Sequence, residues 1–502
     1  MRSDSEVGAA GADAPSPPGR WDWLRADVSA SLVVFLVALP LCVGVAVASG
    51  VPAELGLVTG IVGGLLVGAL PGSTFQVSGP AAGLTVLVYE AVRAYGLETL
   101  GVLVLCAGLL QLVMGALRWG RWFRAISVAV VQGMLAGIGL VLIAGQVYTL
   151  ADRNAPGGGP ENLAGLPSLV GGALTSTPQL TALGVGSVTV AVLVLWPRWK
   201  AGARAVPGPL AAVALATLAV AVLGLEVDRV EVRGVLETVQ PPGLADFGRL
   251  AEVGVVGTVL AFALIASAET LFSAAAVDRL HRGPRTDYDR ELLAQGVGNS
   301  VCGALGALPM TAVIVRSSAN VSAGARTRWS RVLHGAWLLL FVVLVPGALG
   351  VIPVCALAGV LVHAGWKLLP FRELGPLWRA HRGEAVVLVV TALAIVATNL
   401  FEGVVLGLLT AVVKAAWETS HVHLEVRDEG EGRPLRVRVR GNATFLRLPR
   451  LLDQLEALPE ERRVELDLSG LRHVDHACRT ALEGWAERRG AEVDAEAVAR
   501  VG

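Results

Sequence analysis

Long apolar runs recur along most of the chain, from Val28 to about Trp417, separated by short polar loops. A helix needs about 20 apolar residues to cross a bilayer, and many of these runs approach that length. We therefore predict fourteen transmembrane segments, near residues 28–48, 55–70, 80–92, 97–117, 124–148, 178–196, 207–224, 252–277, 291–308, 312–324, 330–349, 352–369, 384–400 and 402–418.

Two runs are unusually short, Pro80–Val92 and Ala312–Gly324, and each follows a break rich in glycine and proline. They are third in the first seven segments and third in the second seven. A repeat with an odd number of spans must be inverted, because its second copy enters the membrane from the opposite side. Matched breaks in inverted halves point to a transport site at the bilayer midplane. The alternative is two tightly turned but ordinary helices.

Composition supports a membrane protein. Hydrophobic residues make up 54% of the 502 residues, a further 60 are glycine, and only 16% are charged. A soluble domain holds about 45–50% apolar residues with glycine included. The net charge is zero, which gives no sign of a nucleic-acid partner. The chain has no phosphate loop, nucleotide fingerprint or nucleophile elbow, so we expect neither an enzyme nor ATP-driven transport. The five cysteines and eight histidines show no ligand spacing, so we expect no metal or other cofactor.

Basic residues predict the orientation. If the N-terminus is cytoplasmic, the inside loops hold Arg and Lys clusters near 118–124, 198–204, 279–290, 326–331 and 367–382. The outside loops then hold only Arg93, Arg153, Arg229, Arg233 and Arg249. Residues 1–24, rich in Ala, Gly, Ser and Pro, are expected to form a disordered cytoplasmic lead-in. The prediction is a multi-pass protein of the cell's inner (plasma) membrane with both termini in the cytoplasm.

Glu269 is the one carboxylate in the run "AFALIASAETLFSAAAV". A charge near the bilayer centre costs several kcal/mol, so it usually faces a partner or a water-filled cavity. Ser273 follows one turn later on the same helix face. The two side chains suit a cation or proton beside a substrate. The alternative is a protonated acid that bonds a neighbouring helix.

The two short segments suit an anion. A helix that begins inside the membrane exposes N–H groups carrying roughly half a positive charge, and two facing ends would trap an anion. Arg316, about one turn into the second short helix, adds a full charge and a planar donor fork. The alternatives are that Arg316 reaches the cytoplasm or pairs with Glu269. In the first segment, "QVSGPAAGL" lets a ligand approach the backbone closely.

After Ser420, alternating apolar and polar residues predict strands in "HLEVRDEGEGRPLRVRVRGNATFL" and "VELDLSGL", with helices after each. We predict three domains: the lead-in at 1–24, a transmembrane domain at 25–419 with repeats at about 25–225 and 250–419, and a small cytoplasmic α/β domain at 420–502.

The pattern resembles the SulP family, the sulfate permease type of anion transporter. The resemblance rests on "VSGPAAGLTVLV", on "ASAETLFSAAAVDRL" followed by "DRELLAQGVGNSVCGALGALP", and on "RSSANVSAGARTRWS". The tail resembles a STAS domain. The resemblance implies seven-plus-seven inverted repeats in core and gate domains, an elevator-like movement and usually a homodimer. It places substrate between the half-helix ends, so the expected binding residues are Ser78, Gly79, Ala81, Ala82, Glu269, Val313, Ile314, Val315 and Arg316.

In sodium-coupled bicarbonate members of the family, a carboxylate with a hydroxyl one turn later helps to hold sodium. The resemblance therefore implies that Glu269 and Ser273 are the ion-coupling residues of this chain. Three positions depart from the family pattern: Leu41 replaces a glutamine, Val45 an aromatic residue, and Ile314 a hydroxyl residue near the second half-helix start.

We therefore expect a secondary active transporter of a small inorganic anion, bicarbonate or sulfate, coupled to sodium or protons or working by exchange. Two alternatives remain. One is a nucleobase or other anion permease with the same inverted-repeat fold. The other is a membrane-anchored signalling scaffold in which the STAS-like tail is the working part.

Overall fold

The computed structural model describes residues 20–121, 127–200, 202, 206–232, 234–428, 430 and 433–493. The predicted lead-in up to residue 19, the predicted loop residues Arg124, Arg204 and Arg233, and the last residues of the tail lie outside this part. The chain divides into two compact units, Met1–Gly407 and Leu408–Gly502.

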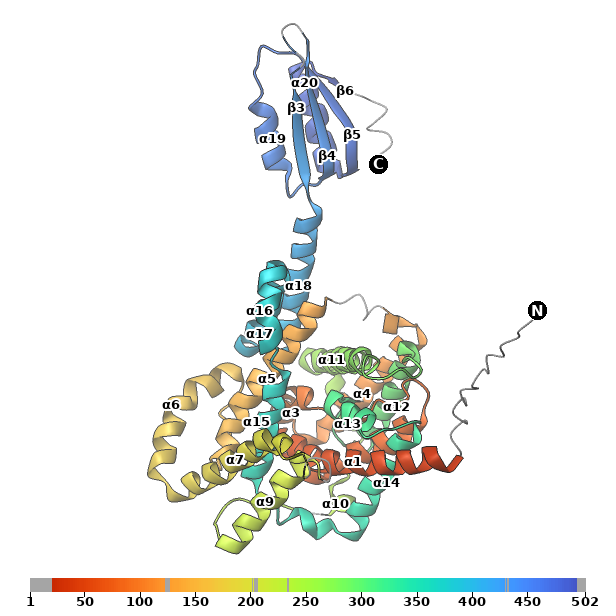
Figure 1. Cartoon of the computed structure of the whole chain (residues 1–502), viewed down its shortest axis with the longest axis vertical. Coiled ribbons are helices and arrows are strands. Elements are labelled where there is room, and N and C mark those ends of the chain that lie inside the picture. The colour runs from red at the N-terminus through yellow and green to blue at the C-terminus, as the bar shows by residue number, and fades with distance from the viewer. Residues whose placement is uncertain are drawn as a thin grey trace, which may run out of the picture. The chain divides into compact units, whose positions relative to one another are not determined.

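The first unit is built almost entirely from helices (Figure 1). The main helices are α1 (Arg20–Ala48), α2 (Ala53–Val62) continuing as the π-helical turn η1 (Gly63–Val67), α3 (Thr85–Tyr95), α4 (Leu97–Ala116), α5 (Val128–Leu150), α6 (Gly159–Thr175), α7 (Thr177–Leu195), α9 (Gly208–Leu223), α11 (Val253–Val277), α12 (Tyr288–Ala304), α13 (Ile314–Ser322), α14 (Trp329–Leu344), α15 (Val354–Leu368), α16 (Phe371–Ala380), α17 (Arg382–Ala397) and α18 (Leu400–Thr419).

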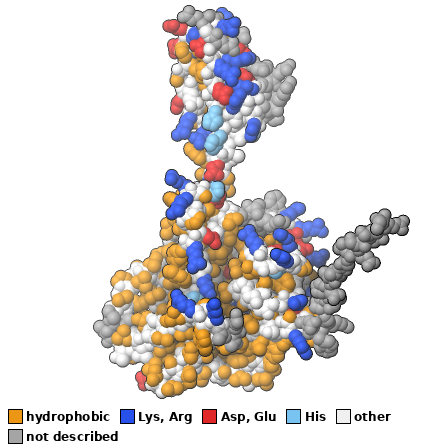
Figure 2. All heavy atoms as spheres, in the orientation of Figure 1, with side chains coloured by type: hydrophobic (Ala, Val, Ile, Leu, Met, Phe, Trp, Pro, Cys, Tyr) orange, Lys and Arg blue, Asp and Glu red, His pale blue; other side chains and the backbone are white. Residues whose placement is uncertain are grey.

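A helix lies at each of the fourteen predicted ranges, while α6 and α16 were not predicted. Among the described residues, seven helices are long and apolar enough to cross a membrane, and three more apolar helices are shorter. Large apolar side chains remain on the outside of the unit, for example Val222 at 74% and Leu223 at 68% exposure. Figure 2 shows these hydrophobic side chains covering much of the visible face. Such a surface suits lipid rather than water.

The helices of the first unit pack in two groups. In one, α4 lies along α12 and α11, and α1 packs on α2, α13 and α14, while α1 also contacts α15 and α9 of the other group. In the other, α5 packs between α15 and α17, and α7 contacts α15 and α9. Small residues allow the closest approach: a Cβ placed on Gly303 of α12 would lie 2.1 Å from the backbone nitrogen of Leu105 in α4. This close packing of backbones through glycine is typical of membrane helices.

Two extended segments interrupt the first group, at the positions where the sequence predicted breaks. The strands β1 (Ser78–Pro80) and β2 (Met310–Ala312) pair antiparallel, with Gly79 opposite Thr311. The short turn η2 (Ala82–Leu84) and then α3 follow β1, whereas α13 follows β2. Because the strands are antiparallel and adjacent, the helices that follow them begin close together and run apart.

The second unit holds a four-stranded sheet in the order β3-β4-β5-β6, made of β3 (Val422–Arg427), β4 (Leu435–Ala443), β5 (Val464–Val474) and β6 (Glu492–Val493). β3 and β4 form an antiparallel hairpin, and the remaining pairs are parallel. Alternate residues of β4 and β5 pack with α19 (Leu448–Glu456) and α20 (His476–Arg489) in one apolar core. The predicted strands and helices are confirmed, and β6 is an additional strand.

Asp475 caps α20 at its N-terminus. Its carboxylate accepts hydrogen bonds from the backbone N–H groups of Cys478 at 2.8 Å and Phe445 at 2.6 Å. Burial alone would raise the pKa of this carboxyl, but the two N–H donors hold it below its usual value. The loop before α20 is therefore fixed by its own side chain.

Candidate functional site

A cavity lies where the two half-helices begin. It has about 70 Å³ of water-accessible volume, room for a small ion together with a few water molecules. It is lined by Leu41, Val45, Pro80, Ala82, Gly83, Met134, Leu135, Glu269, Phe272, Ser273, Val313, Ile314, Val315, Arg316, Ala364 and Leu368. Its walls therefore come from α1, η2, α5, α11, α13 and α15, so it lies between the two helix groups.

Most of the predicted site residues line this cavity: Ala82, Glu269, Ser273, Val313, Ile314, Val315 and Arg316. The other three, Ser78, Gly79 and Ala81, are not lining residues but are close to them in sequence. Ser78 accepts a hydrogen bond from Gln295 Nε2 at 2.6 Å, Gly79 contacts Arg316, and Ala81 is 2% exposed. Leu41 and Val45, the two departures in α1, are also part of the wall, so they remove polar groups from the cavity itself.

The beginnings of the half-helices supply backbone donors. Ala81 and Val313 both have extended backbone, and neither uses a side chain to cap the helix that follows. The first N–H groups of a helix have no partner within the helix. Both beginnings therefore present electropositive backbone to the same small space.

Glu269 extends from α11 onto the first half-helix. A Cβ placed on Gly83 would lie 2.8 and 2.9 Å from its two carboxylate oxygens, so only glycine leaves room for them. Oε2 of Glu269 is buried, and no group in the described part of the chain forms a hydrogen bond with it. Ser273 follows one turn later and is 2% exposed. The cavity thus contains a carboxylate oxygen able to accept a proton or contact a cation.

Arg316 is 1% exposed, which excludes the alternative that it reaches the cytoplasm. Its Nη2 donates to the Pro80 carbonyl at 3.4 Å, and its Nη1 lies 2.1 Å from the position of a Cβ on Gly79. Nε and Nη1 have no hydrogen-bond partner among the residues that the structure describes. In the described part of the chain no ion pair joins Arg316 to Glu269, so the alternative of a simple pair is also excluded.

The Arg316 guanidinium is close to two further side chains that the sequence analysis did not identify as its neighbours. The Cys42 thiol of α1 and the His334 imidazole of α14 both lie within electrostatic reach of the Arg316 guanidinium. His334 is fully buried, and neither ring nitrogen has a partner. Cys42 and His334 are not among the lining residues, so the unpaired donors that reach the cavity are those of Arg316.

Buried side chains hold the two extended segments in place, because their backbone groups lack helical partners. Around the first segment, Gln76 Nε2 donates to the Thr270 carbonyl at 3.0 Å and Ser317 Oγ accepts from Val77 N–H at 2.9 Å. Around the second, Asn299 accepts from Met310 N–H at 2.7 Å and donates to its carbonyl at 3.1 Å.

Sequence reasoning missed this network and several apolar wall residues, including Met134, Phe272 and Leu368. Isolated Gln and Asn residues in apolar runs are the signal that would have indicated the network. No comparable signal separates an apolar wall residue from one that faces lipid.

Comparisons with known proteins match both units. The model of the "Sulfate permease family" matches residues 24–391, and that of the "Mlab, STAS domain" matches residues 426–500. The chain is 28% identical over 396 residues to the putative sulfate transporter YvdB of Bacillus subtilis, covering 77% of this chain and 72% of that protein. It is 25% identical over 506 residues to the bicarbonate transporter BicA of Picosynechococcus sp., covering 92% and 86%.

Solved structures share the fold. The transmembrane domain of a cyanobacterial bicarbonate transporter BicA aligns with a TM-score of 0.67 at 24% identity, covering 78% of this chain and 98% of that one. The overall structure of SLC26A9 aligns with a TM-score of 0.74 at 15% identity, covering 95% and 84%. The architecture is thus a multi-pass helical membrane transporter followed by an α/β STAS domain.

Proposed function

The chain belongs to the sulfate permease family, whose members are anion transporters rather than enzymes, and on that premise we propose that it is a secondary active transporter of bicarbonate or sulfate. One observation carries the proposal: the two half-helix beginnings, the unpaired donors of Arg316 and the carboxylate of Glu269 meet in one small cavity.

Electrostatics favours a small anion in this cavity. Each half-helix beginning contributes roughly half a positive charge, and Arg316 contributes a full one in a region of low dielectric. The apolar wall formed by Leu41, Val45 and Phe272 adds no competing acceptor. We expect modest affinity, because a carrier has to release what it binds.

The choice between bicarbonate and sulfate rests on relatives named for each, the putative sulfate transporter YvdB and the bicarbonate transporter BicA. The cavity offers backbone N–H groups and one guanidinium, which suit both oxyanions.

Glu269 and Ser273 are the proposed coupling residues. A carboxylate with a hydroxyl one turn later suits sodium, and a partnerless carboxylate oxygen suits a proton. Ile314 contributes no hydroxyl where sodium-coupled relatives tend to have one, which counts against sodium. Exchange of one anion for another needs no coupling ion.

The architecture fits an elevator-like movement. We assign α1–α4 and α11–α14 to a core domain that carries the site, and α5, α7, α9, α15, α17 and α18 to a gate domain, which leaves α6 and α16 as connecting helices. This assignment gives fourteen spans in inverted repeats at about 25–225 and 250–419, cytoplasmic termini and a STAS domain at 420–502. It is supported by the two packing groups and by the location of the cavity between them. A homodimer is proposed by family resemblance.

Uptake into proteoliposomes tests the function. Purified protein should accumulate labelled bicarbonate or sulfate, and imposed sodium and proton gradients or internal anion should distinguish the three modes of coupling. Glu269→Gln should abolish the gradient response, while deletion of 421–502 should leave measurable transport. If uracil moves and neither anion does, the substrate class is wrong. If Glu269→Gln has no effect and the deletion abolishes function, the protein is a signalling scaffold.

A further inference from the structure

The segment between α15 and α17 carries cations and aromatic rings that the proposed transport function does not use. It spans residues 366–384 and contains the short helix α16. Pro370 separates α15 from α16, and the chain turns again at His381 before α17 begins. Because α15 and α17 are both apolar helices of a membrane protein, the segment that joins them lies at a boundary between lipid and water.

One face of α16 is apolar and exposed. Phe371 and Trp378 are seven residues apart, so they lie on the same side of the helix, and they are 57% and 48% exposed. Trp366, at the end of α15, is 59% exposed, and its ring lies 4.9 Å from that of Phe371. Aromatic side chains with this exposure are typical of the headgroup level of a bilayer.

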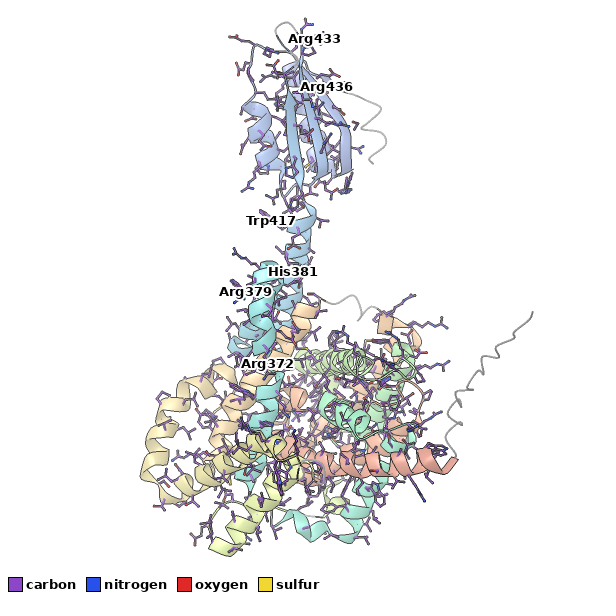
Figure 3. The ribbon with its side chains drawn as sticks, viewed as in Figure 1. Arg372, Arg379, His381, Trp417, Arg433 and Arg436 are labelled. Atoms are coloured by element: carbon purple, nitrogen blue, oxygen red, sulfur yellow. The ribbon has the colours of Figure 1, made fainter. Side chains whose placement is uncertain are left out.

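The adjacent face of α16 is basic. Arg372 and Arg379 are also seven residues apart, and Arg382 follows at the start of α17. Figure 3 shows Arg372 and Arg379 on α16 with His381 just beyond it, and Figure 2 shows basic side chains there among hydrophobic ones. All three arginines are exposed.

These arginines have no acidic partner in the part of the chain that the structure describes. The neighbouring acid Glu373 is already occupied, since it accepts a hydrogen bond from Gln132 Nε2 of α5 at 2.6 Å. That bond also fixes the orientation of α16 against the helix group that contains α5. The exposed arginines therefore remain available to a ligand from outside the protein.

We propose that Arg372, Arg379 and Arg382, together with Trp366, Phe371 and Trp378, form a binding site for anionic phospholipid. The arginines contact the phosphate of the headgroup, and the rings lie among the upper parts of the acyl chains. Neighbouring aromatic and basic side chains on a short exposed helix are the features that recognise an anionic bilayer surface. A soluble anion would use the arginines but leave the three rings in water.

Native mass spectrometry of the full-length, delipidated protein tests the site. Phosphatidylglycerol and phosphatidylcholine with the same acyl chains are titrated against the wild type and the triple variant Arg372→Gln/Arg379→Gln/Arg382→Gln. A basic residue near an anionic surface contributes about fivefold, so the triple variant should bind phosphatidylglycerol roughly a hundredfold more weakly. Phosphatidylcholine binding should not change.

The matched control is Arg450→Gln/Arg463→Gln/Arg472→Gln, which removes the same charge from exposed positions of the STAS domain. It should bind both lipids like the wild type. A second variant, Arg372→Lys/Arg379→Lys/Arg382→Lys, keeps the charge and should retain most of the phosphatidylglycerol affinity. This variant tests the site even if the glutamine variant fails to fold.

Four results would overturn the proposal. Phosphatidylglycerol affinity equal to wild type in the glutamine variant would mean that the arginines do not recognise lipid. An equal loss in the control variant would mean that net charge alone matters. Displacement of phosphatidylglycerol from the wild type by millimolar inorganic phosphate would identify a site for soluble anions. Loss of the dimer peak in the glutamine variant when no lipid is present would identify a second copy of the chain as the occupant of the site. This result would also overturn the proposal.

Discussion

Replacing Gly79 with alanine should displace the Arg316 guanidinium without removing its charge. The new methyl group would lie 2.1 Å from Nη1, whereas non-bonded atoms need about 3.5 Å. Either the guanidinium or the first extended segment must therefore move by roughly 1.4 Å. Gly79 pairs with Thr311 in the strand, so the arginine is the freer of the two groups.

The expected loss follows from the contacts of Arg316. Its hydrogen bond to the Pro80 carbonyl is already long at 3.4 Å and would not survive such a shift. A charge-assisted hydrogen bond contributes about 1.5–3 kcal/mol, so an anion that loses its contact with Arg316 should bind roughly 10- to 100-fold more weakly.

The assay is concentration-dependent uptake of labelled bicarbonate and sulfate into proteoliposomes. Gly79→Ala should raise KM by roughly that factor and leave the thermal stability close to wild type. Gly257→Ala on α11 is the control, because a Cβ at this position meets nothing within 4 Å. A KM within twofold of wild type for Gly79→Ala, when Arg316→Gln raises it, would refute the reasoning.

Three further predictions address other parts of the first unit. Gly83→Ala should shift the Glu269 carboxylate, because its oxygens would lie 2.8 and 2.9 Å from the new Cβ. Uptake should then respond less to sodium or proton gradients. An undiminished response would contradict the coupling role of Glu269. Burial raises the pKa of Asp152, in the turn after α5, to about 6, with the Asp228 charge adding to the rise and the Asp228 N–H opposing it. The folded state thus holds this proton more tightly than the unfolded state, so stability should fall as pH rises from about 4 through 6. For this half-buried group the fall should be about 1 kcal/mol, and melting curves of Asp152→Asn should lack it. Asn299→Leu should lower the free energy of unfolding by about 3 kcal/mol, because both backbone groups of Met310 lose their partner; an unchanged Tm in detergent would argue against the polar network.

Much of the membrane unit could be predicted because lipid imposes a simple rule on the sequence. Apolar runs located the helices, and the breaks before Pro80 and Ala312 located the half-helices. Glu269, the one acid in its run, and Arg316 in the second half-helix indicated the cavity, since a buried charge needs a polar environment.

The parts that escaped prediction obey no such rule. α16 has no buried residue, and its basic and aromatic side chains form a sequence pattern that is typical of a loop. The pairing of β1 with β2 joins three-residue strands from opposite halves of the chain, which no local pattern reveals. An isolated side chain such as Asn299 shows that a polar partner exists but does not show which one.

The junction of β1 and β2 has a consequence for how the protein is made. The N–H group of Val77, just before β1, donates a hydrogen bond to the Oγ of Ser317. Ser317 is synthesised 240 residues later. At about 5–20 residues per second, the earlier segment waits roughly 10 to 50 seconds in the membrane with its peptide groups unsatisfied. The nascent first half therefore requires water, an insertion factor or a neighbouring chain to shield that stretch until its counterpart is synthesised.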